Sequence, residues 1–343
     1  MTLSVPRKRY YTLDIAKAIA IILVAVGHFD VDPMPAFYAG LRSVIYTFHM
    51  PLFMLASGFL CAATWKEMPY VKFISKKFKR LMIPYFATSV IVICIKLCTE
   101  RFLPVDNPVT LKDFIEILWL PKAGYFLWFV YALWWMMVIY PMFNTPMRRK
   151  IFFLATAVLF YFNDVFPDIF CLKETARMAV YFSAGTLFVD FPRKMSVKDI
   201  SLYSLIIFPV LTFLFLEGYL TFDAKPLVML VSLVLAFSGI AFIIVISNWI
   251  DVNVRGKNRQ IILSIAACSY IIYLFHTTFM GFSKAILVKI GFFNTAHLFI
   301  NYSLAELIVP LFSGVFIPFV FTKYVLARFE LTRKLFGIPQ NVN

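Results

Sequence analysis

Charged residues are scarce in this chain of 343 amino acids, and acidic ones are the scarcest. Only 15% of the sequence is charged, with 18 Asp and Glu against 33 Lys and Arg. Hydrophobic residues make up 62% of the chain, and 40 of its residues are Phe. A soluble domain of this length has no core large enough to bury so much apolar surface. The composition therefore excludes an ordinary soluble protein and indicates a membrane protein.

The sequence also lacks the short motifs that hold common cofactors. It contains no GxGxxG or Walker loop, which excludes the usual glycine-rich cradles for nucleotide phosphates. Its five cysteines include no CxxC pair, so we expect neither a disulfide framework nor a metal site. They stand at Cys61, Cys94, Cys98, Cys171 and Cys268, mostly inside apolar runs, where packing in the core is the expected role.

Apolar runs of about 20 residues recur along the whole chain, which is the length that a helix needs to cross a hydrocarbon core of about 30 Å. We therefore predict a single all-α, polytopic membrane domain over 1–343 with about ten transmembrane helices. Their predicted ranges are 13–29, 43–64, 81–99, 125–144, 151–166, 175–191, 200–217, 226–248, 261–281 and 299–326. No small-residue cleavage pattern follows the first run, so we interpret it as a retained helix rather than a signal peptide.

Basic residues fall between the apolar runs rather than in one patch. Clusters at 7–9, 76–80, 147–150, 192–198 and 255–259, together with a basic tail, alternate onto one side of the predicted bundle. By the positive-inside rule that side is the cytoplasm, and ten spans place both termini there. The net charge of +15 is thus interpreted as a topology signal and not as a sign of nucleic-acid binding.

Polar residues at the two ends of the first predicted helix, LDIAKAIAIILVAVGH, share one face. The eleven steps from Lys17 to His28 rotate by about 1100°, or roughly 20° past three full turns. Asp14 lies about 40° away from His28 by the same count, one turn below Lys17. The helix therefore carries a polar stripe through an otherwise apolar run.

Three of the four histidines fall inside predicted spans, namely His28, His49 and His276. All three are expected in the outer half of the membrane, where an ionisable group is costly unless it faces a partner or a wet cavity. Their similar depth favours a shared site over three separate histidines that are each hydrogen-bonded within the bundle. Glu306 in the last predicted helix reaches the same layer, either as an acid paired with a cation or as a partner of a base.

The third predicted helix opens with the basic stretch KKFKRLMIPY. Two interpretations stay open for its cations: they anchor the loop at the cytoplasmic surface and its anionic lipid, or they form a seat for phosphates. In the second interpretation Lys77 and Arg80 bind an anionic ligand together with Lys17, while His28 acts above it.

Six stretches, taken in order, resemble the acyltransferase-3 family of membrane O-acyltransferases, in the manner of its fucose 4-O-acetylase-like branch. They are LDIAKAIAIILVAVGH at 13–28, FHMPLFMLASGFL at 48–60, KRLMIPY at 79–85, LWFVYALW at 127–134, YFSAGTLF at 181–188 and SYIIYLFH at 269–276. In the family a basic residue and a histidine of the first helix have ten residues between them and are implicated in activity. Here they are Lys17 and His28, with Lys in place of the more common Arg.

The resemblance implies transfer of an acyl group, usually acetyl, from cytoplasmic acetyl-CoA to a hydroxyl of a glycan or glycolipid at the outer face of a bacterial inner membrane. His28 is then the catalytic group, with His49 and His276 beside it. Lys17, Lys77 and Arg80 would hold the acetyl-CoA. A histidine can take the proton of the attacking hydroxyl or carry the acyl group itself, and the sequence does not choose between these roles. A transporter or flippase of a lipid-linked glycan is the main alternative function, because polar residues at the membrane midplane also mark substrate pathways.

Side chains that could bind the acceptor are expected near the outer ends of the helices. Trp128 and Tyr131 can stack on a sugar ring, although interfacial aromatic belts explain most Trp and Tyr residues at such positions. Arg177 is a second candidate, but Glu174 stands one turn before it and predicts a simple i, i+3 ion pair. Glu306 completes this group. The oligomeric state is left open by the sequence.

Overall fold

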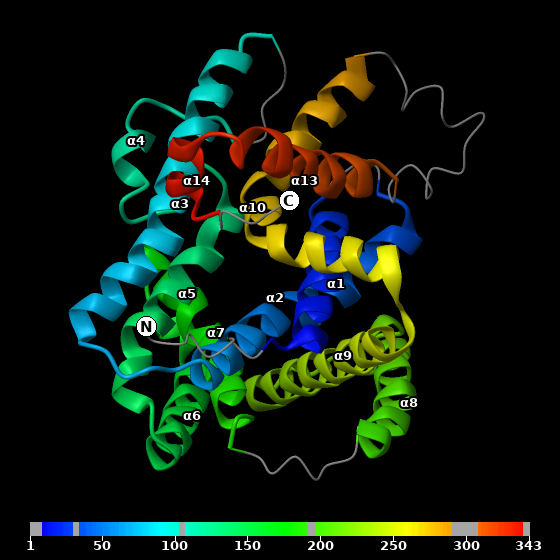
Figure 1. Ribbon diagram of the computed structural model, residues 1–343. Coiled ribbons are helices and arrows are strands. Elements are labelled where there is room, and N and C mark those ends of the chain that lie inside the picture. Colours follow the sequence, from blue (N-terminus) through cyan, green and yellow to red (C-terminus); the bar gives the residue numbers. More distant parts are fainter. Residues whose placement is uncertain (1–8, 30–33, 103–106, 191–196, 290–307, 339–343) are drawn as a thin grey trace.

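The computed structural model describes residues 9–29, 34–102, 107–190, 197–289 and 308–338, which are predominantly helical (Figure 1). Within these ranges, six helical segments are long and apolar enough to cross a membrane. They are α1 (Tyr11–His28), α2 (Ala36–Ala63), α3 (Tyr70–Thr99), the run Tyr125–Phe143 that contains α5 (Trp128–Ile139), α9 (Lys225–Asn253) and α10 (Gly256–Lys289). The all-helical, multi-pass membrane architecture predicted from the sequence is thus confirmed.

Shorter helices complete the bundle. They are α6 (Pro146–Tyr161), α7 (Leu172–Leu187), α8 (Val197–Leu216) and a C-terminal run of η5 (Pro310–Phe316), α13 (Ile317–Phe321) and η6 (Thr322–Leu326). A final short helix, α14 (Glu330–Phe336), packs back against α3. Every predicted helix overlaps one of these elements, whereas the number of true spans and the cytoplasmic position of the termini remain predictions.

The three largest errors in the predicted boundaries arise because charged residues continue the helices instead of ending them. Helix α3 begins at Tyr70 rather than 81, so the basic stretch is helical, and Pro84 lies inside the helix. Helix α2 begins at Ala36 rather than 43, and α10 runs on to Lys289 rather than ending at 281. Lys and Arg are good helix formers that lower the hydropathy of a window without breaking the backbone. The start predicted at 299 for the last helix lies outside the described residues.

Helices α2 and α7 approach each other closely near the end of the bundle where both finish. A Cβ atom built on Gly58 would lie 2.0 Å from the Phe182 carbonyl oxygen, and one on Gly185 would lie 2.1 Å from the Leu55 carbonyl oxygen. No side chain fits at either position. The two glycines therefore bring the backbones of α2 and α7 into direct contact.

Helix α1 lies inside the assembly, packed against α2, α9, α10 and η5 (Figure 1). Gly314 of η5 allows this approach, because a Cβ atom there would lie 3.0 Å from Ala25 of α1 and 2.8 Å from the Met280 sulfur of α10. The neighbours thereby fix the position of the His28 end of α1.

Ion pairs stabilise the end of the bundle where α1 and α10 begin and α9 finishes, which we call the basic end. Asp251 accepts hydrogen bonds from Arg259 and from the Thr12 hydroxyl, the latter at 3.2 Å. The Arg259 guanidinium also lies over the ring of Tyr11, 4.3 Å from its centroid. These contacts tie three helix ends together.

A second pair joins the start of α6 to the residues after α7. Arg149 donates to both carboxylate oxygens of Asp190, at 2.8 and 2.6 Å, and to the Asn144 carbonyl at 3.0 Å. Arg149 is 7% exposed, so its charge is neutralised inside the protein.

The cysteines divide between the core and the helix surface. Cys61, Cys171 and Cys268 are buried as expected, but Cys94 and Cys98 are exposed. The latter two stand four residues apart and share the outward face of α3. The core-packing prediction was therefore wrong for that pair.

Candidate active site

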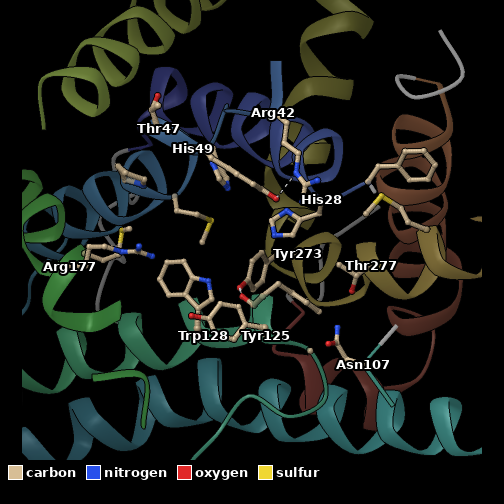
Figure 2. Close-up of a pocket in the computed structure, with 18 of the residues that line it drawn as sticks. His28, Arg42, Thr47, His49, Asn107, Tyr125, Trp128, Arg177, Tyr273 and Thr277 are labelled. Carbon is tan, nitrogen blue, oxygen red and sulfur yellow. Dashed lines mark hydrogen bonds between the residues drawn. The ribbon is translucent and has the colours of Figure 1, made fainter. Parts of the chain in front are cut away.

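A cavity of about 1400 Å³ opens at the end of the bundle opposite the basic end. It is lined by the last turns of α1 and α3, the second half of α10, and the first halves of α2, α7 and α9. The predicted topology places all of these segments on the outer side. Figure 2 shows His28, His49 and Arg42 on one side of the cavity, facing Trp128 and Tyr125 on the other.

The structure brings the three histidines together from three different helices. The ring centroids of His28 and His276 lie 5.1 Å apart, and those of His28 and His49 lie 6.2 Å apart. His28 and His49 line the cavity. His276 is fully buried behind them and packs edge-on against Phe126, with the ring centroids 5.1 Å apart. The residues expected in one membrane layer thus form one cluster.

Hydrogen bonds fix the orientation of each imidazole. The Nδ1 atoms of His28, His49 and His276 lie 2.8, 2.7 and 2.7 Å from backbone carbonyl oxygens of their own helices. A carbonyl oxygen only accepts, so each Nδ1 carries the hydrogen and each neutral ring keeps its lone pair on Nε2. The Nε2 atoms of His49 and His276 are buried and have no partner within the described part of the chain. His28, half-buried at the cavity surface, is the member of the cluster best placed to meet a ligand.

Arg42 and Tyr46 support the cluster from α2 and were missed by the sequence analysis. Tyr46 donates to the Gly27 carbonyl at 2.7 Å, and its ring lies edge-on to that of His28. The Arg42 Nε donates to the Tyr46 hydroxyl at 3.3 Å. The predicted helix began one residue after Arg42, so Arg42 was left outside it. Arg42 stands seven residues, or two turns, before His49, and this spacing could have placed the two residues on the same helix face.

Of the two aromatic candidates for sugar binding, only one lies in the cavity wall that faces the histidines. Trp128 lines the cavity, as expected of a residue that could stack on a sugar. Tyr131 does not: it is buried, and its hydroxyl donates to the carbonyls of Ile117 and Leu118 at 2.9 and 2.7 Å. Tyr131 therefore holds the loop before α5 in place, and its proposed role in sugar stacking was wrong.

Arg177 reaches into the cavity from α7, beside Trp128 (Figure 2). The predicted pair with Glu174 does not form. Glu174 is buried and accepts a 2.6 Å hydrogen bond from the Tyr125 hydroxyl instead. In the part of the chain that the structure describes, no carboxylate lies within ion-pair distance of the exposed Arg177 side chain.

The candidate donor residue of α1 lies at the basic end and outside the cavity. The Lys17 ammonium lies 2.8 Å from Asp14, which also accepts from Arg9 at 2.8 Å. This contact confirms the shared face predicted for Asp14 and Lys17.

The candidate donor residues of α3 come from a helix that packs against α10, as α1 also does. Lys77 lies over the Phe73 ring, 5.2 Å from its centroid. Arg80 precedes Leu81, whose carbonyl accepts a 2.8 Å hydrogen bond from Tyr270, six residues before His276. Lys77 and Arg80 do not line the cavity either, and Glu306 falls outside the described residues.

Comparison with known proteins gives one match that spans most of the chain. A family model described as an acyltransferase domain, that of the acyltransferase-3 family, matches residues 10–325. No curated protein and no solved structure shows significant similarity to the chain. The matched range includes all three histidines of the cluster and every described residue that lines the cavity.

Proposed function

We propose that this chain, which belongs to the acyltransferase-3 family and is therefore a membrane acyltransferase, moves an acetyl group from cytoplasmic acetyl-CoA to a hydroxyl of a cell-surface polysaccharide or lipid-linked glycan. It would do so in the plasma membrane of a bacterium, with both termini in the cytoplasm. The histidine cluster at the cavity is the observation that supports this assignment most strongly.

His28 has the geometry of a general base. Its Nδ1 hydrogen is held by the Val24 carbonyl, which leaves the Nε2 lone pair for the proton of an acceptor hydroxyl. As that proton moves to Nε2, the hydroxyl oxygen bonds to the thioester carbonyl carbon and the carbon–sulfur bond breaks. The proton then passes from Nε2 to the departing thiolate, so that an ester and free CoA result and His28 is regenerated.

The same lone pair permits a two-step route. In that route Nε2 attacks the thioester carbonyl carbon, the carbon–sulfur bond breaks, and CoA leaves as the thiolate while His28 becomes an acetyl-imidazolium that keeps its Nδ1 hydrogen. The acceptor hydroxyl then attacks the acetyl group, the bond from Nε2 to the carbonyl carbon breaks, and the hydroxyl proton passes to the thiolate, so that His28 is restored and free CoA results. His49 and His276 contact His28 through their ring edges in either case, and we assign them to positioning it.

The donor would enter from the basic end. Lys17, Lys77 and Arg80 supply positive charge there for the phosphates of acetyl-CoA. Along α1 the rise from Lys17 to His28 is about 16 Å, a span that the extended pantetheine arm can cover. Asp14 already neutralises part of the Lys17 charge, so we expect Lys17 to contribute only a share of the affinity.

The acceptor would enter from the outer end, through the cavity. Trp128 offers an aromatic face across the cavity from His28, where a sugar ring can stack while one of its hydroxyls points to Nε2 (Figure 2). Donor and acceptor thus approach the histidine cluster from opposite ends of the bundle.

A cell-based comparison separates this function from glycan transport. Cells without the gene are complemented with the wild type, His28→Ala or His28→Gln at matched protein levels, and surface glycan and its base-labile esters are measured by mass spectrometry. We expect both variants to keep the glycan and lose the ester. Loss of the glycan itself would support the transporter, and unchanged esters would remove His28 from the mechanism.

A further inference from the structure

The charge of the cavity indicates what kind of acceptor it receives. We infer that the acceptor is anionic, and that Arg177 binds its carboxylate or phosphate while Trp128 covers the adjoining sugar ring. This inference rests on the proposed function and narrows its substrate class from glycans in general to acidic ones.

Arg177 is the first support. Its side chain is exposed to the cavity, and the carboxylate that its own helix offers, Glu174, is turned to Tyr125. A guanidinium at the membrane end of a bundle, with no counter-charge among the described residues, is costly unless water or a ligand supplies one. Its planar fork of N–H donors fits a carboxylate or a phosphate in bidentate geometry.

The rest of the described lining has the same sign. Lys and Arg side chains enter it from four helices, at Arg42, Lys96, Arg177 and Lys284. The carboxylate that lines the described part of the cavity, Asp164, is held by Lys225 at 3.0 Å. Positive charge in a concave, low-dielectric site concentrates anions there and raises their rate of entry.

The anionic group has two possible sources, an acidic sugar or a sugar phosphate in the glycan linkage. Three acceptor sugars with the same pyranose ring distinguish these two sources. Methyl glucoside is neutral, methyl glucuronoside carries a carboxylate, and glucose 1-phosphate carries a phosphate. Purified full-length protein is given acetyl-CoA and each sugar, and kcat/KM is obtained from CoA release and confirmed by mass spectrometry of the ester.

We expect at least one acidic sugar to exceed methyl glucoside about tenfold in kcat/KM, which corresponds to one charge-assisted contact. Arg177→Gln should bring that ratio close to one, and Arg177→Lys should keep part of it. Lys173→Gln is the matched control, because it removes the same charge one turn away on α7 from a residue that does not line the cavity.

Three results would overturn the inference but not the proposed transferase activity. The first is a kcat/KM for the acidic sugars close to that for methyl glucoside in the wild type, and the second is a preference for an acidic sugar that persists in Arg177→Gln. The third is a KM for acetyl-CoA, rather than for the acidic sugar, that rises in Arg177→Gln.

If the purified protein acetylates none of the three sugars, the inference is tested in cells instead. The glycan whose esters disappear in His28→Ala is identified by mass spectrometry, and an acidic repeat unit supports the inference. A neutral repeat unit overturns it. Esters that persist in His28→Ala would contradict the proposed function itself, and the acidic-acceptor inference, which rests on it, would fall as well.

Discussion

Helices α2 and α7 are in backbone contact toward one end of the bundle and border a cavity toward the other. Near the basic end, Gly58 and Gly185 leave no space for even one methyl group between them. Toward the opposite end, His49 of α2 and Arg177 of α7 both line the cavity. The same pair of helices thus builds the rigid part of the protein and the open part that receives a ligand.

Charge follows the same division. At the basic end, Arg149, Arg259 and Lys17 each have a carboxylate partner within the chain. At the cavity, the described residues give Arg177 no such partner. Charges that are paired internally hold the fold, whereas a charge left facing a cavity can act on a ligand.

The largest effect is expected where the two backbones touch. Gly58→Leu should abolish the folded protein, because its Cβ alone would overlap the Phe182 carbonyl. Gly40→Ala on the same helix is the control: its Cβ would meet Leu216 at an ordinary 3.6 Å, and Ala favours the helix over Gly. Size-exclusion chromatography in detergent should show a folded peak for Gly40→Ala alone. A folded Gly58→Leu protein would contradict the account of this contact.

A smaller effect on stability is expected from breaking an internal ion pair. Arg149→Gln should destabilise the protein by about 2 kcal/mol, since it leaves Asp190 without its charge-assisted partner. The control Lys334→Gln removes an exposed pair with Glu330 and should leave the melting temperature nearly unchanged. Thermal unfolding in detergent measures both. Equal melting temperatures would mean that the Arg149 pair does not stabilise the fold.

The smallest effect concerns the donor and tests whether the basic end also binds a ligand. Lys17→Gln should raise the KM for acetyl-CoA about tenfold, as expected for one lost charge-assisted contact, and Lys17→Arg should stay near the wild type. Asp14→Asn, which frees Lys17 from its internal partner, should not weaken acetyl-CoA binding. Unchanged KM in Lys17→Gln would assign this pair to structure only.

The sequence predicted what depends on one helix at a time. The helix content followed from apolar run length, and the shared face of Asp14 and Lys17 followed from rotation per residue. Boundaries failed at Tyr70 and Ala36, where charged residues extend a helix beyond its apolar run. The mean hydropathy of a window predicts whether a segment lies in lipid or in water. It does not predict where the helix of that segment begins or ends.

The parts of the site that depend on contacts between helices were harder to predict from the sequence. The meeting of His28, His49 and His276 could be anticipated from their similar depth. The pairing of Glu174 with Tyr125 instead of Arg177 could not be anticipated. It depends on where the turn before α5 packs against α7. Arg42 was lost for the simpler reason that it stands just outside the apolar run of α2. Periodicity assigns a residue to a face but does not identify its partner on another helix.

Donor binding and acetyl transfer can both be measured on the same purified His28→Ala protein. We expect acetyl-CoA affinity to equal that of the wild type, because the proposed donor cations lie at the other end of α1. Transfer should fall by at least about 100-fold, the loss typical of removing a proton-transfer group. Intact-mass analysis after exposure to acetyl-CoA alone then assigns the role, since an acetylated wild-type chain that is absent in His28→Ala indicates a carrier rather than a base. Near-normal transfer by His28→Ala would mean that acyl transfer does not take place at His28 in this cavity.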